Sequence, residues 1–190
     1  MASASSAPGG ADAPRESASY GDNGAEDVAY DPGHCACVVA ARDVVSADPA
    51  TLFEHIADPS RQIAWDGNDN LDHAAAEQRV TAVGDVFRTR LTNGQTRENH
   101  VVEFVEGELI AWMPADVGAE PAGHLWRWSI ASRAEGRAEV THTYDWSRLA
   151  DERRLAKARA MTADHLAASV ARLKQLCEAQ DGTGARPDGR

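Results

Sequence analysis

Alternation of apolar and polar residues over positions 72–146, followed directly by a helical pattern, constrains the fold more than any other feature of the sequence. Successive side chains of a strand point to opposite faces of a sheet, so a period of two predicts strands. Turn-forming residues interrupt the alternation at positions 84–85, 93–94, 107–108, 118–123 and 135–136. The stretch therefore predicts about six consecutive antiparallel strands.

Residues 151–180 follow with apolar side chains at the spacing of one helix face. The stripe consists of Thr162, Leu166, Ser169, Val170, Leu173, Leu176 and Cys177. A helix of roughly 25 residues would be about 37 Å long, which makes it the longest element of the chain. The sheet has to bury one of its faces, and we expect this helix to cover it.

The start of the domain predicts one more strand and two short helices. A valine-rich strand is expected at residues 37–46. Pro49 then begins a helix, because a proline in the first turn needs no amide partner, and Pro59 ends it. A second short helix is expected at residues 59–64. This order predicts an α+β fold, in which a curved antiparallel sheet of about seven strands wraps around the long C-terminal helix.

Composition divides the chain of 190 residues into one folded domain with two tails. Residues 1–33 carry acidic side chains against a single arginine and have almost no large apolar side chains, so we expect a disordered acidic tail. Residues 180–190 are expected to be disordered for the same reason. The folded domain is expected at residues 34–179.

Charge and apolar content argue against several kinds of partner. A formal net charge of −11 would repel the phosphates of nucleic acid, so no nucleic-acid partner is expected. No run approaches the roughly 18 apolar residues that span a bilayer, and the first residues lack the pattern of a signal peptide. We therefore expect a cytoplasmic protein without membrane insertion. The sequence leaves its oligomeric state open.

Motifs for metal, cofactor or covalent chemistry are absent from the sequence. The run at residues 34–37 offers one histidine and two cysteines, but it lacks the second pair that a zinc site needs, so no metal is predicted. There is no nucleophile elbow, glycine-rich phosphate loop or dinucleotide fingerprint. No cofactor is expected.

Three segments of the sequence carry a resemblance to a known family. They read VVSADPATLFEHIADPSRQIAWDG at residues 44–67, LWRWSIASRAEGRAEVTHTYDWSRL at 125–149 and TADHLAASVARLKQL at 162–176. Together they resemble the START-like, or SRPBCC, superfamily, specifically its bacterial polyketide cyclase/dehydrase branch. The resemblance covers about residues 37–178. It implies the helix-grip fold with an interior cavity for a lipid, polyketide, sterol or hormone-like molecule, and Trp65 closing one end of that cavity.

The last two predicted strands supply the candidate wall of the cavity. Trp126 and Trp128 share one face of the first, and His142 and Tyr144 share one face of the second. With the helix and one further strand, the expected ligand-binding set is Trp65, Phe104, Trp126, Trp128, His142, Tyr144, Leu166 and Val170. The alternative is that these side chains pack against the terminal helix as ordinary core with no ligand.

The candidate catalytic residues are His100, His142 and Tyr144. A histidine can exchange a proton near neutral pH, and a tyrosine hydroxyl can stabilise an enolate oxygen, as aldol cyclisation and dehydration require. Alternation would place His100 and Glu98 on the same face as Phe104, beside His142. Two alternatives stay open: Arg97 and Asn99 are the inward residues, or these polar groups are satisfied and not catalytic.

These expectations favour binding of a small hydrophobic or aromatic molecule, polyketide- or lipid-like, in an internal cavity. One form of this function is a cofactor-free polyketide cyclase, aromatase or dehydratase of secondary metabolism. The second form is a non-catalytic carrier of a lipid or metabolite, which needs only a concave apolar pocket. A third hypothesis is a protein-interaction module of the chaperone-regulator type, which would need an exposed apolar patch.

Overall fold

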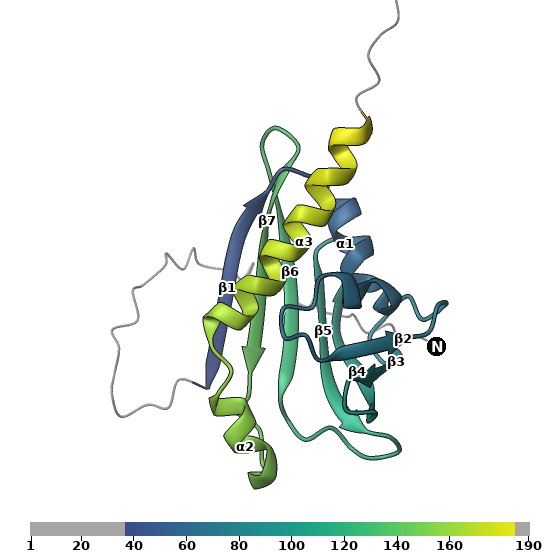
Figure 1. Ribbon diagram of the computed structural model, residues 1–190, viewed down its shortest axis with the longest axis vertical. Coiled ribbons are helices and arrows are strands. Elements are labelled where there is room, and N and C mark those ends of the chain that lie inside the picture. The colour runs from purple at the N-terminus through teal and green to yellow at the C-terminus, as the bar shows by residue number, and fades with distance from the viewer. Residues whose placement is uncertain (1–36, 185–190) are drawn as a thin grey trace, which may run out of the picture. The chain divides into compact units, whose positions relative to one another are not determined.

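A curled sheet of seven antiparallel strands forms the frame of the molecule (Figure 1). The computed structural model describes residues 37–184. The strands are β1 (Val38–Val45), β2 (Leu71–Ala74), β3 (Val86–Leu91), β4 (Thr96–Val105), β5 (Leu109–Asp116), β6 (Leu125–Arg133) and β7 (Arg137–Asp145). Their order in the sheet is β1-β7-β6-β5-β4-β3-β2. The predicted meander of six strands, β2 to β7, is confirmed, and β1 pairs with β7 at one edge of the sheet. The tail predicted at 1–33 and the run at 34–36 lie outside the described residues.

The two predicted short helices follow β1. Helix α1 spans Pro49–Ala57, and the 3-10 helix η1 spans Pro59–Ala64. An aspartate begins each of them: Asp48 Oδ1 accepts a hydrogen bond from Ala50 N at 2.7 Å, and Asp58 Oδ1 accepts one from Ser60 N at 3.0 Å. A capping carboxylate satisfies an amide that has no partner within the helix, and the proline after it fits the first turn.

The C-terminal helical pattern forms two helices, α2 (Glu152–Arg159) and α3 (Ala163–Gly184), where the pattern predicted one. The break comes at residues 160–162, and Thr162 directly precedes the first residue of α3, with its Oγ1 2.9 Å from His165 Nδ1. Threonine is a favoured residue at such a position. The long helix α3 is confirmed and crosses the concave side of the sheet (Figure 1). Within residues 37–184, no helix combines the length and apolar character needed to cross a membrane.

Helix α3 holds the sheet and the short helices together. Its buried side chains Val170 and Leu173 belong to one core with Phe53 of α1 and Val140 of β7. The segment after η1 also touches α3, since the Gly67 amide donates to Ser169 Oγ at 2.9 Å. These contacts do not cover the part of the concave face near α2, where other residues surround a cavity.

Candidate ligand-binding cavity

A cavity of about 440 Å³ lies between the concave face of the sheet, the segment after η1, and helix α2. Pockets for small ligands typically have about 300–1,000 Å³. The residues that line its interior include Gln62, Trp65, Thr89, Asn99, Trp112, Trp126, Trp128, His142 and Tyr144. The inner face of β6 and β7 therefore forms one wall, as predicted, and η1 with the loop after it forms another.

Stacked aromatic rings make up the β6–β7 wall. Trp128 pairs with His142 across the two strands and Trp126 pairs with Tyr144, so the side chains of each pair lie on the same face. The ring centroids of Trp128 and His142 are 3.8 Å apart at 11°, and those of Trp126 and Tyr144 are 4.2 Å apart. Trp65 meets Trp128 edge-on at 5.1 Å. The rings cover one another's faces and together present a largely apolar surface to the cavity, which suits an apolar or aromatic partner.

The two candidate catalytic residues on this wall are neutral near pH 7. Burial lowers the pKa of His142 to about 3, against the opposing effect of a backbone hydrogen bond at Leu166. Burial raises the pKa of Tyr144 to about 12. A general base works best with a pKa near the working pH, so His142 is a weak base here. The arrangement suits holding a molecule better than abstracting a proton from it.

The depressed pKa of His142 predicts acid sensitivity. An unfolded chain protonates this histidine below its ordinary pKa of 6.5, whereas the folded protein resists protonation down to about 3, so stability is lost as the pH falls from 6.5. We expect His142 to contribute a slope of up to about 1.4 kcal/mol per pH unit. Replacing His142 with phenylalanine, which keeps the stack, should remove that slope. Urea unfolding at pH 7 and pH 5 measures it; an unchanged slope in the variant would contradict the assignment.

His124 also lines the cavity and also has a depressed pKa. Its pKa is lowered to about 4, first by burial and then by the positive charges of Arg154, Arg97 and Lys157. It adds to the acid sensitivity in the same direction as His142, so the variant above should retain part of the slope. Its Nδ1 atom is buried without a hydrogen-bond partner among the described residues.

The structure separates His100 from His142, so the expected grouping of these histidines with Glu98 is wrong. Arg97 and Asn99 line the cavity, whereas Glu98 and His100 lie in a separate hollow with Arg88. Glu98 accepts hydrogen bonds there from the Gly118 amide at 2.9 Å and from Arg88 at 2.6 Å, which together lower its pKa.

A β-bulge explains the difference. The register of β4 against β5 shifts between Val101 and Glu103, so two residues of β4 stand where the alternation allows one. Asn99 and Val101 therefore face inward, and after the bulge Phe104 faces inward as well. Counting by twos back from Phe104 reaches the wrong face at His100.

Three of the expected ligand-binding residues lie in the core instead of on the cavity surface. Phe104 packs edge-on against Phe53 with ring centroids 5.8 Å apart. Leu166 and Val170 are fully buried between α3 and the sheet. The lining on this side comes from α2 and the break after it, through Lys157, Ala158 and Met161. Sequence reasoning missed these because it placed them on one continuous helix.

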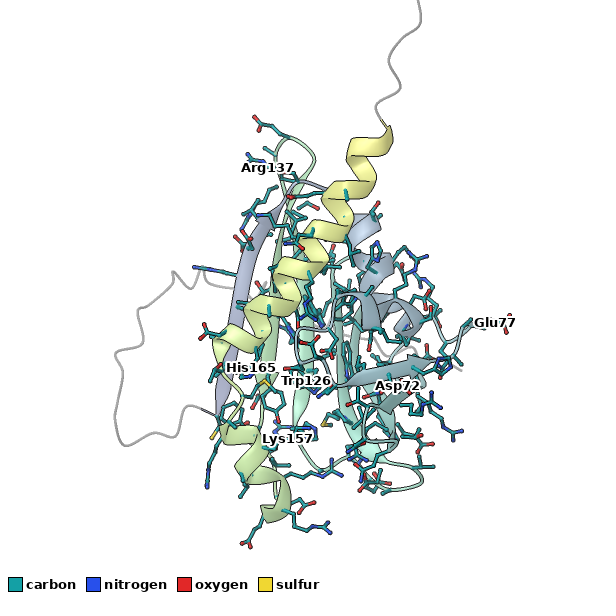
Figure 2. The ribbon with its side chains drawn as sticks, in the orientation of Figure 1. Asp72, Glu77, Trp126, Arg137, Lys157 and His165 are labelled. Carbon is teal, nitrogen blue, oxygen red and sulfur yellow. The ribbon has the colours of Figure 1, made fainter. Side chains whose placement is uncertain are left out.

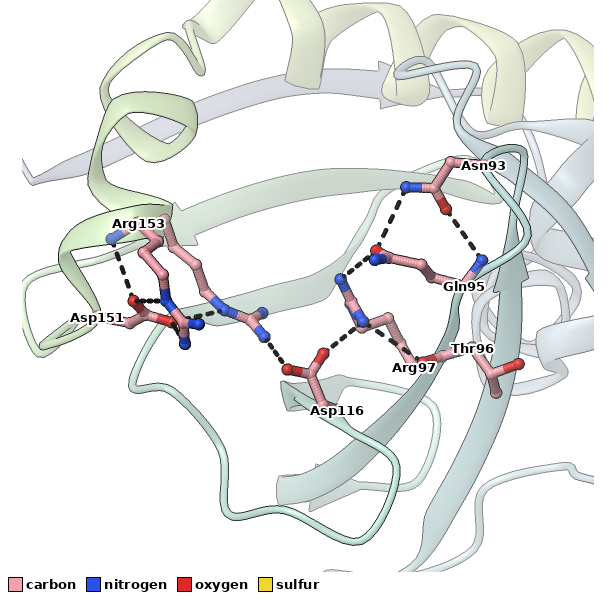
Figure 3. Close-up of polar contacts among 8 residues, drawn as sticks. Asn93, Gln95, Thr96, Arg97, Asp116, Asp151 and Arg153 are labelled. Atoms are coloured by element: carbon pink, nitrogen blue, oxygen red, sulfur yellow. Dashed lines mark hydrogen bonds and ion pairs between the residues drawn. The ribbon is translucent and has the colours of Figure 1, made fainter.

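The exposed side of the cavity carries a set of charged side chains, and Figure 3 shows the contacts of Arg97, Asp116, Asp151 and Arg153 within it. We call it the charged rim; it consists of Arg97, Asp116, Asp151, Arg153, Arg154 and Lys157. Asp116 at the end of β5 binds Arg97 of β4 and, at 2.9 Å, Arg154 of α2. Asp151 binds Arg153 at 3.0 Å. The rim thus connects the sheet to α2 across the cavity. No group of metal-ligating side chains is found within residues 37–184.

Comparison with known proteins supports the fold. No family model matches the sequence. One curated relative, the uncharacterized protein Rv0088 of Mycobacterium tuberculosis, is 29% identical over 105 residues, which are 54% of this chain and 44% of that protein. The match thus spans less than half the length of this relative.

Solved structures resemble this chain more completely. The Aha1 dimer from Colwellia psychrerythraea covers 74% of this chain and 96% of its own, with a TM-score of 0.51 and 16% identity. The match to DynU16, a putative protein of the dynemicin biosynthetic locus, covers 76% of this chain and 48% of DynU16, with a TM-score of 0.54 and 19% identity. The match to a protein from Rhodobacter sphaeroides covers 77% of this chain and 95% of that protein, with a TM-score of 0.55 and 19% identity. At this level of identity the likeness shows the fold, whereas the family remains a prediction. The chain is a helix-grip domain with a curled antiparallel sheet and a long C-terminal helix.

Proposed function

We propose that the protein binds and holds a flat, mostly apolar small molecule, polyketide- or lipid-like, in the cavity under the β6–β7 wall. The observation that carries the proposal is the stack of Trp126, His142 and Trp128 beside a cavity of about 440 Å³. Aromatic side chains bury large apolar areas and pair with other rings in offset-stacked or edge-to-face arrangements. The likeness to DynU16, a protein of a biosynthetic locus, supports a ligand of that kind.

The catalytic form of the function, a cofactor-free polyketide cyclase or dehydratase, has less support. Its two candidate groups in the cavity are a histidine with a pKa of about 3 and a tyrosine with a pKa of about 12. His100, the third candidate, lies outside the cavity. The interaction-module hypothesis rests on a likeness of fold to Aha1 alone.

Binding of the neutral dye phenylnaphthylamine tests the proposal, since the dye fluoresces strongly only in an apolar site. We expect saturable binding, and about tenfold weaker binding after replacement of Trp126 by alanine, because Trp126 lines the cavity and is the tryptophan of the wall that is only partly buried, so its loss removes apolar contact with the ligand. Phe104→Ala is the matched control: it removes a half-buried aromatic ring that packs against Phe53, away from the cavity. Equal affinity of all three proteins, or no saturation with the wild type, would contradict the proposal.

A further inference from the structure

The charged rim is positive although the protein is acidic. Four cationic side chains, Arg97, Arg153, Arg154 and Lys157, stand there with the carboxylates of Asp116 and Asp151. The whole chain carries a formal charge of −11, so an excess of cations around one cavity opposes the trend of the sequence. Charges around a cleft with apolar walls act together on whatever enters it.

The two carboxylates of the rim are already shared among the arginines. Asp116 lies between Arg97 and Arg154, and Asp151 binds Arg153 and, at 3.4 Å, Arg154. Lys157 has no ion-pair partner anywhere in residues 37–184. Figure 2 labels it on α2, below Trp126, and both side chains line the cavity. A lysine without an ion-pair partner among the described residues thus lines the same cavity as the aromatic wall.

One more acid lines the cavity, Asp66, and it does not neutralise the rim. Its two carboxylate oxygens accept hydrogen bonds from the backbone amides of Asn68 and Asn70, each at 3.1 Å. It therefore belongs to the loop after η1. His124, between the wall and the rim, responds to the excess of cations, since Arg154, Arg97 and Lys157 all lower its pKa.

We propose that the ligand of the cavity is an acid, with a flat apolar body against Trp126 and an anionic group, such as a carboxylate, at the ammonium of Lys157. This rests on the proposed function and names the chemical class of its ligand. A hydrogen bond between an ammonium and a carboxylate is about twice as strong as a neutral one, and it fixes the orientation of the bound ligand. The apolar body is then directed inward, toward Trp128, and the anionic group stays at the exposed side.

Two dyes with the same aromatic frame test this. Anilinonaphthalene sulfonate carries one negative charge, and phenylnaphthylamine is its neutral counterpart. We expect the wild-type protein to bind both, each displacing the other. Lys157→Glu should weaken binding of the sulfonate about tenfold, because it replaces an attraction by a repulsion, and leave the neutral dye within about twofold. Glutamate is a good helix former, so the exposed position on α2 accepts it.

Arg159→Glu is the matched control. Arg159 is exposed on the same helix, does not line the cavity, and its replacement changes the net charge by the same amount. It should leave both dyes within about twofold of wild type at 0.15 M salt, where charges beyond about 8 Å are screened. Circular dichroism and thermal melts verify that all three proteins are equally folded.

The outcomes separate this inference from the proposed function. If the neutral dye binds and Lys157→Glu leaves the sulfonate unaffected, the inference is overturned while the proposed function stands. Equal losses from Lys157→Glu and Arg159→Glu also overturn it, because net charge alone would then explain the effect. Failure of both dyes to bind the wild type overturns the proposed function and this inference with it.

Discussion

Replacing Gly123 with alanine is expected to destabilise the protein by about 4 kcal/mol, because the new methyl group meets backbone that cannot move aside. Gly123 adopts a φ of 102°, which L-residues rarely do, and a Cβ there would collide with the carbonyl oxygen of Arg148 and lie 2.8 Å from its carbonyl carbon. The strained φ and the displaced backbone both contribute to this cost. Urea unfolding followed by circular dichroism measures it.

Gly118, in the same loop between β5 and β6, is the matched control for this substitution. Its φ is also positive, at 73°, but a Cβ there would meet no atom within 4 Å. Gly118→Ala should therefore cost only the conformational strain, about 1 kcal/mol. Equal costs at the two positions would show that the loop does not pack against Arg148 as the structure has it. Gly123 precedes His124, so its substitution should also disturb the rim side of the cavity.

Replacing Trp128 with alanine should cost about 3 kcal/mol of unfolding free energy. Trp128 is 1% exposed and contacts both Trp65 and His142, and truncation of a buried tryptophan typically costs about 3–5 kcal/mol. Its indole N–H has no hydrogen-bond partner among the described residues. Removing a donor that is buried and unpaired offsets part of the loss.

Trp128→Phe distinguishes the ring from the N–H group. Phenylalanine keeps a flat ring against His142 and removes the unpaired donor, so we expect a cost of about 1 kcal/mol or less. The alanine variant should also lose binding of the neutral dye, whereas the phenylalanine variant should retain it. A cost for phenylalanine as large as that for alanine would mean that the indole N–H makes an interaction in solution that the structure lacks.

The fold could be predicted from the sequence because its signals are local and redundant. Alternation and turn residues mark each strand of the meander, and the dipeptides Asp48-Pro49 and Asp58-Pro59 both punctuate and cap the short helices. The face of each of the last two strands was also predictable, since Trp126, Trp128, His142 and Tyr144 follow uninterrupted alternation in strands that pair without a bulge.

The rest of the site depends on two irregularities that leave little trace in the sequence. The bulge between Val101 and Glu103 reverses the faces within β4, and no glycine marks it. The break at residues 160–162 lies within a pattern that reads as one helix, because Ala160 and Met161 are good helix formers. Thr162 is the one signal that could have indicated it, as a residue that favours helix starts.

The break at residues 160–162 divides the C-terminal helical pattern into two helices, α2 and α3, with different structural roles. Helix α3 supplies buried core from Leu166 to Cys177. Helix α2 buries only Ala158 fully, packs the partly buried Leu155 against a smaller apolar cluster, and is also joined to the sheet through the charged rim. Moving α2 away would therefore expose less apolar area than unfolding of the main core, so we expect it to cost less free energy than unfolding. We therefore expect substitutions on the exposed face of α2 to change the residence time of a bound molecule more than the stability of the fold, and substitutions of the core residues of α3 to do the reverse.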